Sequence, residues 1–105
     1  MVLTAKPGSE DAVSTALAEL ADQIRDLPGL IELTAGPNVH ARSREAGVSH
    51  GLLVRLESEE SLAAYRIHPA HQALMPKLDA GAAERLVLSW PVEEHTHVRR
   101  AGAVG

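Results

Sequence analysis

Pairs of proline and glycine divide the first part of the chain into short pieces. They lie at Pro7–Gly8, Pro28–Gly29 and Gly36–Pro37. Proline lacks a backbone donor and glycine adopts conformations closed to other residues, so such pairs mark turns and end regular elements. The pieces between them predict a strand over residues 2–6, a helix over residues 9–27 and a strand over residues 30–35.

The helix over residues 9–27 has a well-defined start and one apolar face. Ser9 is a suitable N-cap, and Glu10 and Asp11 lie where the helix dipole favours anions. Apolar side chains then recur every three or four residues, at Val13, Leu17, Leu20 and Ile24. This spacing is typical of an amphipathic helix with one face to bury.

The chain continues with a polar loop over residues 38–49 and a strand over residues 50–57. Alternation in that strand places His50, Leu52, Val54 and Leu56 on one face. Ser58 predicts the N-cap of another helix, which Pro69 interrupts because the residue before a proline avoids helical geometry. A further helix is expected over residues 70–78.

The end of the chain predicts one more strand and a tail. Residues 80–83 indicate a loop, and residues 84–92 predict a strand on which large side chains alternate. These side chains are Leu86, Leu88, Trp90 and Val92. Residues 94–105 show no periodicity, and we expect them to be flexible or wrapped on a partner subunit, so that the domain spans residues 1–93.

The order of elements favours an α+β fold with one antiparallel sheet and helices on one of its faces. Apolar residues nevertheless occur on both sides of the strands, such as Ile31 and Leu33, or Leu53 and Val87. A two-layer monomer would leave the second face in water, whereas pairing with a second copy of the chain would bury it. The sequence therefore predicts a homodimer.

Composition excludes several classes of function. The net charge of -4 and the isoelectric point near 5.8 argue against nucleic-acid binding, which requires clustered Lys and Arg. The chain has no cysteine, which excludes disulfides, thiolate metal sites and cysteine nucleophiles. No apolar run is long enough to span a membrane, and no secretory signal begins the chain, so we expect a soluble, cytoplasmic protein without membrane contact.

The segment from Tyr65 to His71 has the residue types needed for proton transfer. It contains the only tyrosine and, at His68 and His71, two of the six histidines. A phenol can donate to a developing oxyanion, and an imidazole can act as a general base near neutral pH. The segment predicts a site but does not name a reaction.

This segment also resembles the stress-responsive A/B barrel (Dabb) family, and the resemblance covers roughly residues 2–92. The matching stretches are Val2–Leu3, Lys6–Pro7–Gly8, Leu27–Pro28–Gly29–Leu30, Ser49–His50–Gly51, and Leu62–Ala63–Ala64–Tyr65 leading into His68–Pro69–Ala70–His71. The family implies ferredoxin-like βαββαβ subunits whose four-stranded antiparallel sheets pair face to face in a dimeric α/β barrel.

The polyketide cyclase branch of this family is similar in the same motif and implies roles for individual residues. Its members close a linear thioester by aldol condensation without a cofactor, and the match assigns catalysis to Tyr65 and His71. A pocket histidine at the start of the third strand corresponds to His50. Another pocket histidine, in the first strand of those cyclases, has no counterpart here.

Each of these residues also has a structural interpretation. His71 could bond a backbone carbonyl, and Tyr65 could be a core phenol. His50 could be a satisfied core histidine, and His68 could brace the kink before the proline rather than contribute to binding. Trp90 could line the pocket, although packing in the core or in a dimer interface is the usual role of such a residue.

Three hypotheses for function follow. The first is a cofactor-free cyclase, isomerase or lyase that acts on a polyketide-like or other carbonyl compound by acid–base catalysis. The second is a non-enzymatic stress-responsive dimer that binds a small hydrophobic or carbonyl ligand. The third is a monooxygenase of the antibiotic-biosynthesis type, which shares the dimeric fold. We expect no metal, because the histidines lack a recognised ligand spacing.

Overall fold

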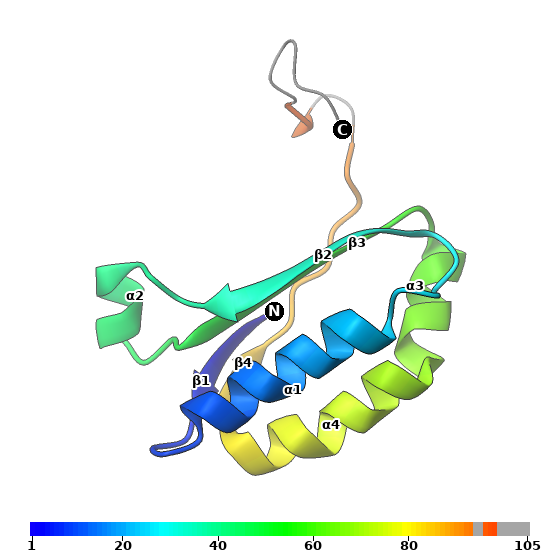
Figure 1. The fold of residues 1–105 in the computed structure, drawn as a ribbon. Coiled ribbons are helices and arrows are strands. Elements are labelled where there is room, and N and C mark those ends of the chain that lie inside the picture. Colours follow the sequence, from blue (N-terminus) through cyan, green and yellow to red (C-terminus); the bar gives the residue numbers. More distant parts are fainter. Residues whose placement is uncertain (94–95, 99–105) are drawn as a thin grey trace.

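The structure is a computed structural model that describes residues 1–93 and 96–98, and it has four strands and four helices in these residues (Figure 1). The strands are β1 (Val2–Ala5), β2 (Leu30–Pro37), β3 (His50–Leu56) and β4 (Ala82–Leu86). The helices are α1 (Glu10–Gln23), α2 (Ala41–Glu45), α3 (Glu59–Ile67) and α4 (Pro69–Gly81). The predicted tail over residues 94–105 lies, apart from residues 96–98, outside the described residues.

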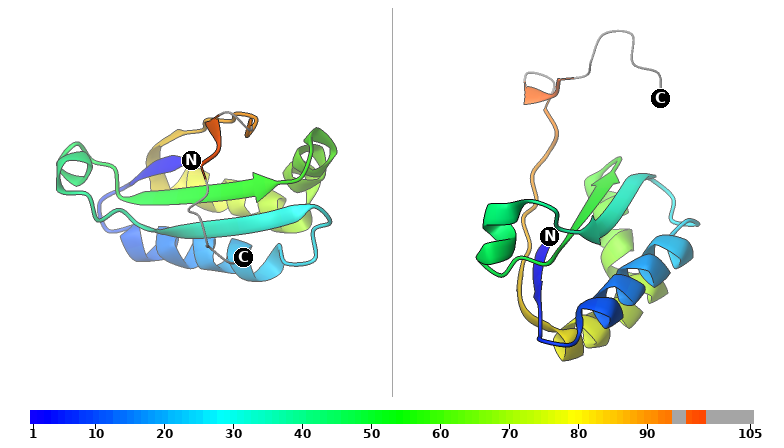
Figure 2. Two further views of the ribbon diagram at one scale, coloured as in Figure 1. Left: turned by 90° about the horizontal axis from the view of Figure 1, so that it is seen from above. Right: turned by 60° about the vertical axis from the view of Figure 1, so that its left-hand side comes forward.

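The four strands form one antiparallel sheet in the order β2-β3-β1-β4. Figure 2 shows α1 and α4 side by side on one face of the sheet, with α3 beyond the end of α1. This arrangement confirms the predicted α+β, ferredoxin-like class. No helix in the described part of the chain is long and apolar enough to cross a membrane.

The core lies between the sheet and the helices. The apolar stripe predicted for α1 is buried there, and α4 contributes Leu74 and Leu78. Leu3 in β1 and Leu52 in β3 close the core from the side of the sheet. The predicted period of α1 is therefore confirmed by burial, although α1 itself ends at Gln23 and residues 24–26 form a turn.

The junction of α3 and α4 follows from local chemistry. The Ser58 hydroxyl accepts the backbone N–H of Ser61 and caps α3, as predicted. His68 has an extended backbone, with φ of -60° and ψ of 138°, because Pro69 follows it. Pro69 then occupies the first position of α4, where a missing N–H costs nothing.

Some predicted boundaries were wrong. The loop expected at residues 80–83 does not form, since α4 continues to Gly81 and β4 starts at Ala82. The expected polar loop over residues 38–49 contains the short helix α2, and β2 extends to Pro37 because it stays paired with β3 as far as His50. The expected strand over residues 84–92 ends at Leu86, because Leu86 pairs with Val2 and β1 offers no partner beyond that residue.

The face of the sheet opposite the helices carries exposed apolar side chains on β1, β3 and β4. Val2, Leu53 and Leu86 lie on it, and each is exposed. We call these three side chains the outer patch. Val87, Leu88 and Trp90 follow directly after β4 and are exposed as well. The sequence prediction of apolar residues on both faces of the sheet is confirmed, and the outer patch has no cover within the described residues.

Candidate functional site

Tyr65 and His71 lie together at the junction of α3 and α4. Tyr65 belongs to the last turns of α3, and His71 to the first turn of α4. Their ring centroids are 4.7 Å apart, and the ring planes are tilted by 59°. The break at Pro69 turns the chain between them, so the two rings meet although they belong to different helices. The structure therefore brings this predicted pair into direct contact.

The hydrogen bond that His71 makes defines its tautomer. Its Nδ1 lies 3.1 Å from the carbonyl oxygen of Arg66. A carbonyl can only accept, so Nδ1 carries the proton, and in the neutral ring the lone pair is on Nε2. That nitrogen has no hydrogen bond to any residue in the described part of the chain. Nε2 of His71 is thus a free basic atom.

Burial shifts the pKa of both groups in useful directions. It raises the pKa of Tyr65 to about 12, so the phenol stays protonated at neutral pH. Burial also lowers the pKa of His71 from 6.5, and the positive charge of Arg66 lowers it further, against the opposing effect of the hydrogen bond to the Arg66 carbonyl. A neutral imidazole therefore lies beside a protonated phenol.

The Tyr65 side chain is almost enclosed, with 8% of its surface exposed. Its hydroxyl makes no hydrogen bond to the residues that the structure describes. It is not sealed from solvent either, since no fully buried side-chain oxygen among these residues lacks a partner. The hydroxyl thus keeps its capacity to donate to another molecule.

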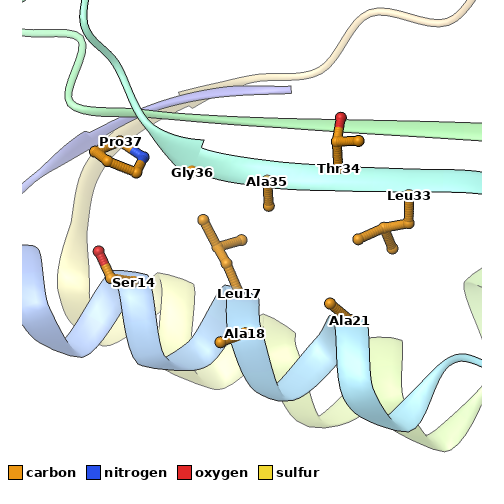
Figure 3. Close-up of a pocket in the computed structure, with 9 residues that line it drawn as sticks. All are labelled: Ser14, Leu17, Ala18, Ala21, Leu33, Thr34, Ala35, Gly36 and Pro37. Carbon is orange, nitrogen blue, oxygen red and sulfur yellow. The ribbon is translucent and has the colours of Figure 1, made fainter.

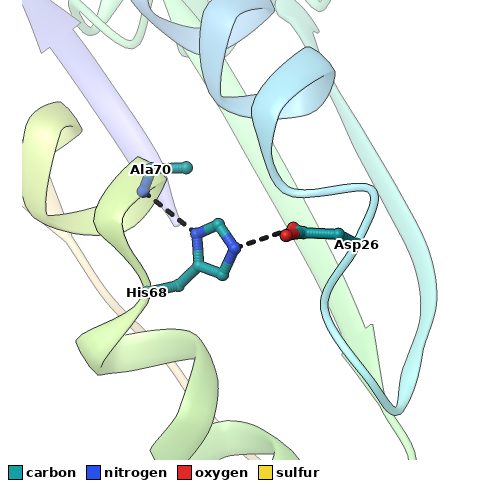
Figure 4. A network of polar contacts seen from close by, with 3 residues as sticks. All are labelled: Asp26, His68 and Ala70. Atoms are coloured by element: carbon teal, nitrogen blue, oxygen red, sulfur yellow. Dashed lines mark hydrogen bonds and ion pairs between the residues drawn. The ribbon is translucent and has the colours of Figure 1, made fainter.

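His68 makes a separate set of contacts, with Asp26 and Ala70 (Figure 4). Its Nδ1 accepts the backbone N–H of Ala70 at 3.0 Å and caps α4. Its Nε2–H donates to Asp26 at 2.8 Å. These two contacts use both ring nitrogens. They fit the interpretation that His68 braces the chain before Pro69. A role for His68 in ligand binding stays a prediction.

His50 lies in a separate chain of hydrogen bonds. It is 2% exposed, with Nε2 at 2.8 Å from the Ser14 hydroxyl and Nδ1 at 2.8 Å from the Ser49 hydroxyl. Within the described residues, no hydrogen bond or ring contact joins His50 to Tyr65 or His71. The structure therefore does not connect the three predicted residues directly.

Sequence reasoning missed Ser14 and Ser49 as polar partners of this histidine. Ser49 precedes His50 in the chain, which could have drawn attention to it. Ser14 is 36 positions away and comes into contact only because α1 packs across β3. No signal in the sequence joins these two positions.

Trp90 lies outside both sets of residues. It follows the end of β4 and is 65% exposed, so it does not pack in the core of this chain. The prediction that it lies in a dimer interface or pocket wall stays open to test. No three His, Asp or Glu side chains lie close enough to hold a metal ion among residues 1–93 and 96–98.

A cavity of about 450 Å³ opens between α1 and β2 (Figure 3). Its walls include Leu17 and Ala21 from α1, and Leu33 and Ala35 from β2. Ser14 lies at one end of it. A second hollow lies between α1 and α4 and is lined by residues such as Thr15, Glu19 and Lys77. Neither includes Tyr65 or His71.

Comparison with known proteins identifies the family. The model of the stress-responsive A/B barrel domain matches residues 1–92. The chain belongs to the Dabb family. The match covers every helix and strand of the fold and both sets of polar residues described above. No curated protein matches the chain.

Solved structures similar to this Dabb domain include several dimers. A dimeric ferredoxin-like protein of unknown function from Jannaschia sp. CCS1 is 30% identical, with a TM-score of 0.68 over 77% of this chain and 80% of that one. One from Thermobifida fusca is 23% identical, with a TM-score of 0.63 over 81% and 80%. A protein from Arabidopsis thaliana is 20% identical, with a TM-score of 0.69 over 88% and 91%. The last two show the likeness of fold alone.

Proposed function

We propose that this Dabb protein is a homodimer that acts on a carbonyl compound by acid–base catalysis, with His71 as the base and Tyr65 as the acid. The observation that supports it best is the contact between Nδ1 of His71 and the carbonyl oxygen of Arg66. The Arg66 carbonyl holds the proton on Nδ1, so the unprotonated Nε2 is available close to the Tyr65 ring. A base and an acid that are both in the required protonation state at neutral pH need no cofactor for proton transfer.

The proposed reaction begins with removal of a proton from the carbon next to a carbonyl group. Nε2 of His71 takes this proton, and the electron pair of the C–H bond moves into an enolate. The Tyr65 hydroxyl donates to the developing oxyanion, which is the role of an oxyanion hole. The enolate carbon can then attack a second carbonyl, as in a cyclase, or be protonated elsewhere, as in an isomerase.

Dimer formation in this proposal uses the outer patch. Val2, Leu53 and Leu86 are apolar, exposed and on the face that the helices leave uncovered. The dimeric state of the proteins from Jannaschia sp. CCS1 and Thermobifida fusca supports the same conclusion. Pairing of two sheets through this face would remove apolar surface from water in both copies.

The catalytic proposal is tested by exchange of the α-hydrogens of a β-ketoacyl thioester in deuterated buffer, followed by NMR. We expect the protein to accelerate exchange, and His71→Ala to lower the rate by about 10²- to 10⁴-fold. Tyr65→Phe should lower it by about 10²- to 10³-fold. The free energy of unfolding of Tyr65→Phe should stay within about 0.5 kcal/mol of the wild-type value, since the hydroxyl has no hydrogen-bond partner to lose in the described residues. Equal rates for the wild type and both folded variants would reject the proposal.

A second candidate function is a dimer that binds a small ligand without turnover. The observation that favours it is the enclosure of Tyr65, together with the position of both cavities away from the pair. This alternative predicts no exchange above the uncatalysed rate, but an unfolding temperature that rises with ligand concentration by mass action. The same exchange assay therefore separates the two candidates.

A further inference from the structure

The cavity between α1 and β2 has one polar side chain directed towards it. Thr34 is among its lining residues, but its hydroxyl points away from the cavity, whereas Ser14 lies at its end (Figure 3). The other lining side chains are small or apolar, and no charged residue is among them. The volume of about 450 Å³ lies within the range of pockets that hold small ligands, about 300–1,000 Å³.

The Ser14 hydroxyl is the outer end of a buried chain of hydrogen bonds. Ser49 Oγ donates to the carbonyl oxygen of Leu3 at 3.3 Å and accepts the backbone N–H of Ala5 at 2.9 Å. Since its one proton is used in this way, Ser49 accepts from Nδ1–H of His50. Nε2 of His50 is then an acceptor, and the Ser14 O–H donates to it.

This order of donors determines what Ser14 offers to the cavity. Its only proton is directed to His50, so the free lone pairs of its oxygen are what remains for another molecule. An oxygen that donates its own proton also becomes a better acceptor, because successive hydrogen bonds polarise one another. The end of the cavity therefore accepts a hydrogen bond and does not give one.

We propose that this cavity binds a neutral, mainly apolar small molecule with one hydroxyl group, such as an alcohol or a phenol, whose O–H donates to Ser14. The apolar walls take the carbon skeleton, and the absence of a cation among the lining residues disfavours a carboxylate. The site is distinct from Tyr65 and His71 and stands whether or not that pair is catalytic. It would supply the ligand-binding alternative with a position and a ligand class.

The test compares three probes of nearly equal length by NMR titration of the full-length protein: 2-octanol, 2-octanone and octanoate. Amide signals of Ala21, Ala35 and Gly36 report on the cavity walls. We expect 2-octanol to shift these signals and to bind roughly two- to tenfold more tightly than 2-octanone, because the ketone has no proton to donate. Octanoate should bind more weakly than either.

Variants separate the polar end from the apolar walls. Ser14→Ala should retain binding but remove the preference for 2-octanol over 2-octanone. Ala21→Leu should abolish binding of 2-octanol and 2-octanone by filling the cavity. Thr15→Ala, next in the chain but outside this cavity, is the matched control and should change nothing. Tyr65→Phe should leave binding unchanged, so a failure of the catalytic proposal does not affect this one.

The inference is overturned if 2-octanol produces no shifts at these amides or if octanoate binds as tightly as 2-octanol. It is equally overturned if Ser14→Ala keeps the full preference for the alcohol, because the hydroxyl of another residue would then be responsible. Unchanged binding in Ala21→Leu would mean that the ligand binds elsewhere, and it would also overturn the inference.

Discussion

Replacement of Leu53 by lysine tests whether the outer patch is a dimer interface. Leu53 lies on β3, one of the two inner strands of the sheet, and 43% of its surface is exposed in the single chain. Complete burial of a leucine side chain contributes about 1.5–3 kcal/mol. The exposed fraction therefore corresponds to about 0.6–1.3 kcal/mol in each subunit, if the partner covers it fully.

A two-fold interface contains this substitution twice, so Leu53→Lys should weaken the dimer by about 1.3–2.6 kcal/mol. That corresponds to an increase of roughly 10- to 80-fold in the dissociation constant, before the cost of burying two ammonium groups is added. Sedimentation velocity over a range of protein concentrations measures this change. The circular dichroism spectrum of the variant should remain that of a folded α+β protein.

Ile67→Lys is the matched control, because Ile67 is 76% exposed at the end of α3 and lies outside the sheet. We expect its dissociation constant to equal that of the wild type. The reasoning is refuted if Leu53→Lys is folded and dimerises as tightly as Ile67→Lys. In that case the copies would have to meet through another surface.

Three further predictions concern the turns and the candidate site. Gly29→Ala should destabilise the fold by about 1–3 kcal/mol in urea unfolding, because Gly29 has φ of +85° and a Cβ there would clash with the Ser61 side chain. His68→Ala should lower stability by about 1 kcal/mol through loss of the α4 cap, whereas Asp26→Ala, at the exposed end of the same contact, should change it by less than about 0.5 kcal/mol. The rate of α-hydrogen exchange should fall as pH drops, with a midpoint below 6.5, because His71 must be unprotonated to act as a base.

Each of these has an outcome that contradicts it. Gly8 has φ of +82° but open space around it, so Gly8→Ala should destabilise the fold less than Gly29→Ala. Equal losses of stability would show that the clash with Ser61 contributes nothing. Equal losses in His68→Ala and Asp26→Ala would assign the stability to the hydrogen bond between His68 and Asp26 instead of the cap. A midpoint above 6.5 would mean that another group is the base.

The stability of the folded chain should also fall as the pH drops, because of His71. Its pKa is lower in the folded protein than in the unfolded chain, so the unfolded chain binds more protons just below pH 6.5. The contribution of His71 to stability is fully present above pH 6.5, and it is lost as the pH falls through the window between the two pKa values. His71→Gln should remove this part of the pH dependence.

Local patterns predicted the parts of the fold that depend on neighbours in sequence. The period of α1, the Ser58 cap and the break before Pro69 are all set by residues a few positions apart, and each is found in the structure. The contact between Tyr65 and His71 follows from the same cause, since the break lies between them. Contacts between distant segments, such as that of Ser14 with His50, depend on how α1 lies across the sheet, which no local pattern records.

The end of β4 shows what alternation of side chains does and does not predict. Large residues alternate from Leu86 to Val92, which indicates an extended segment with one side to bury, but a strand also needs a neighbour that offers hydrogen bonds. In this chain β1 ends the available pairing at Val2, so residues 87–92 keep the pattern without a partner in the described part of the chain. The exposed Leu88 and Trp90 lie next in sequence to the outer patch. The proposed dimer would offer such side chains a second apolar surface, whereas a longer β4 would need a pairing strand that the described part of the chain does not supply.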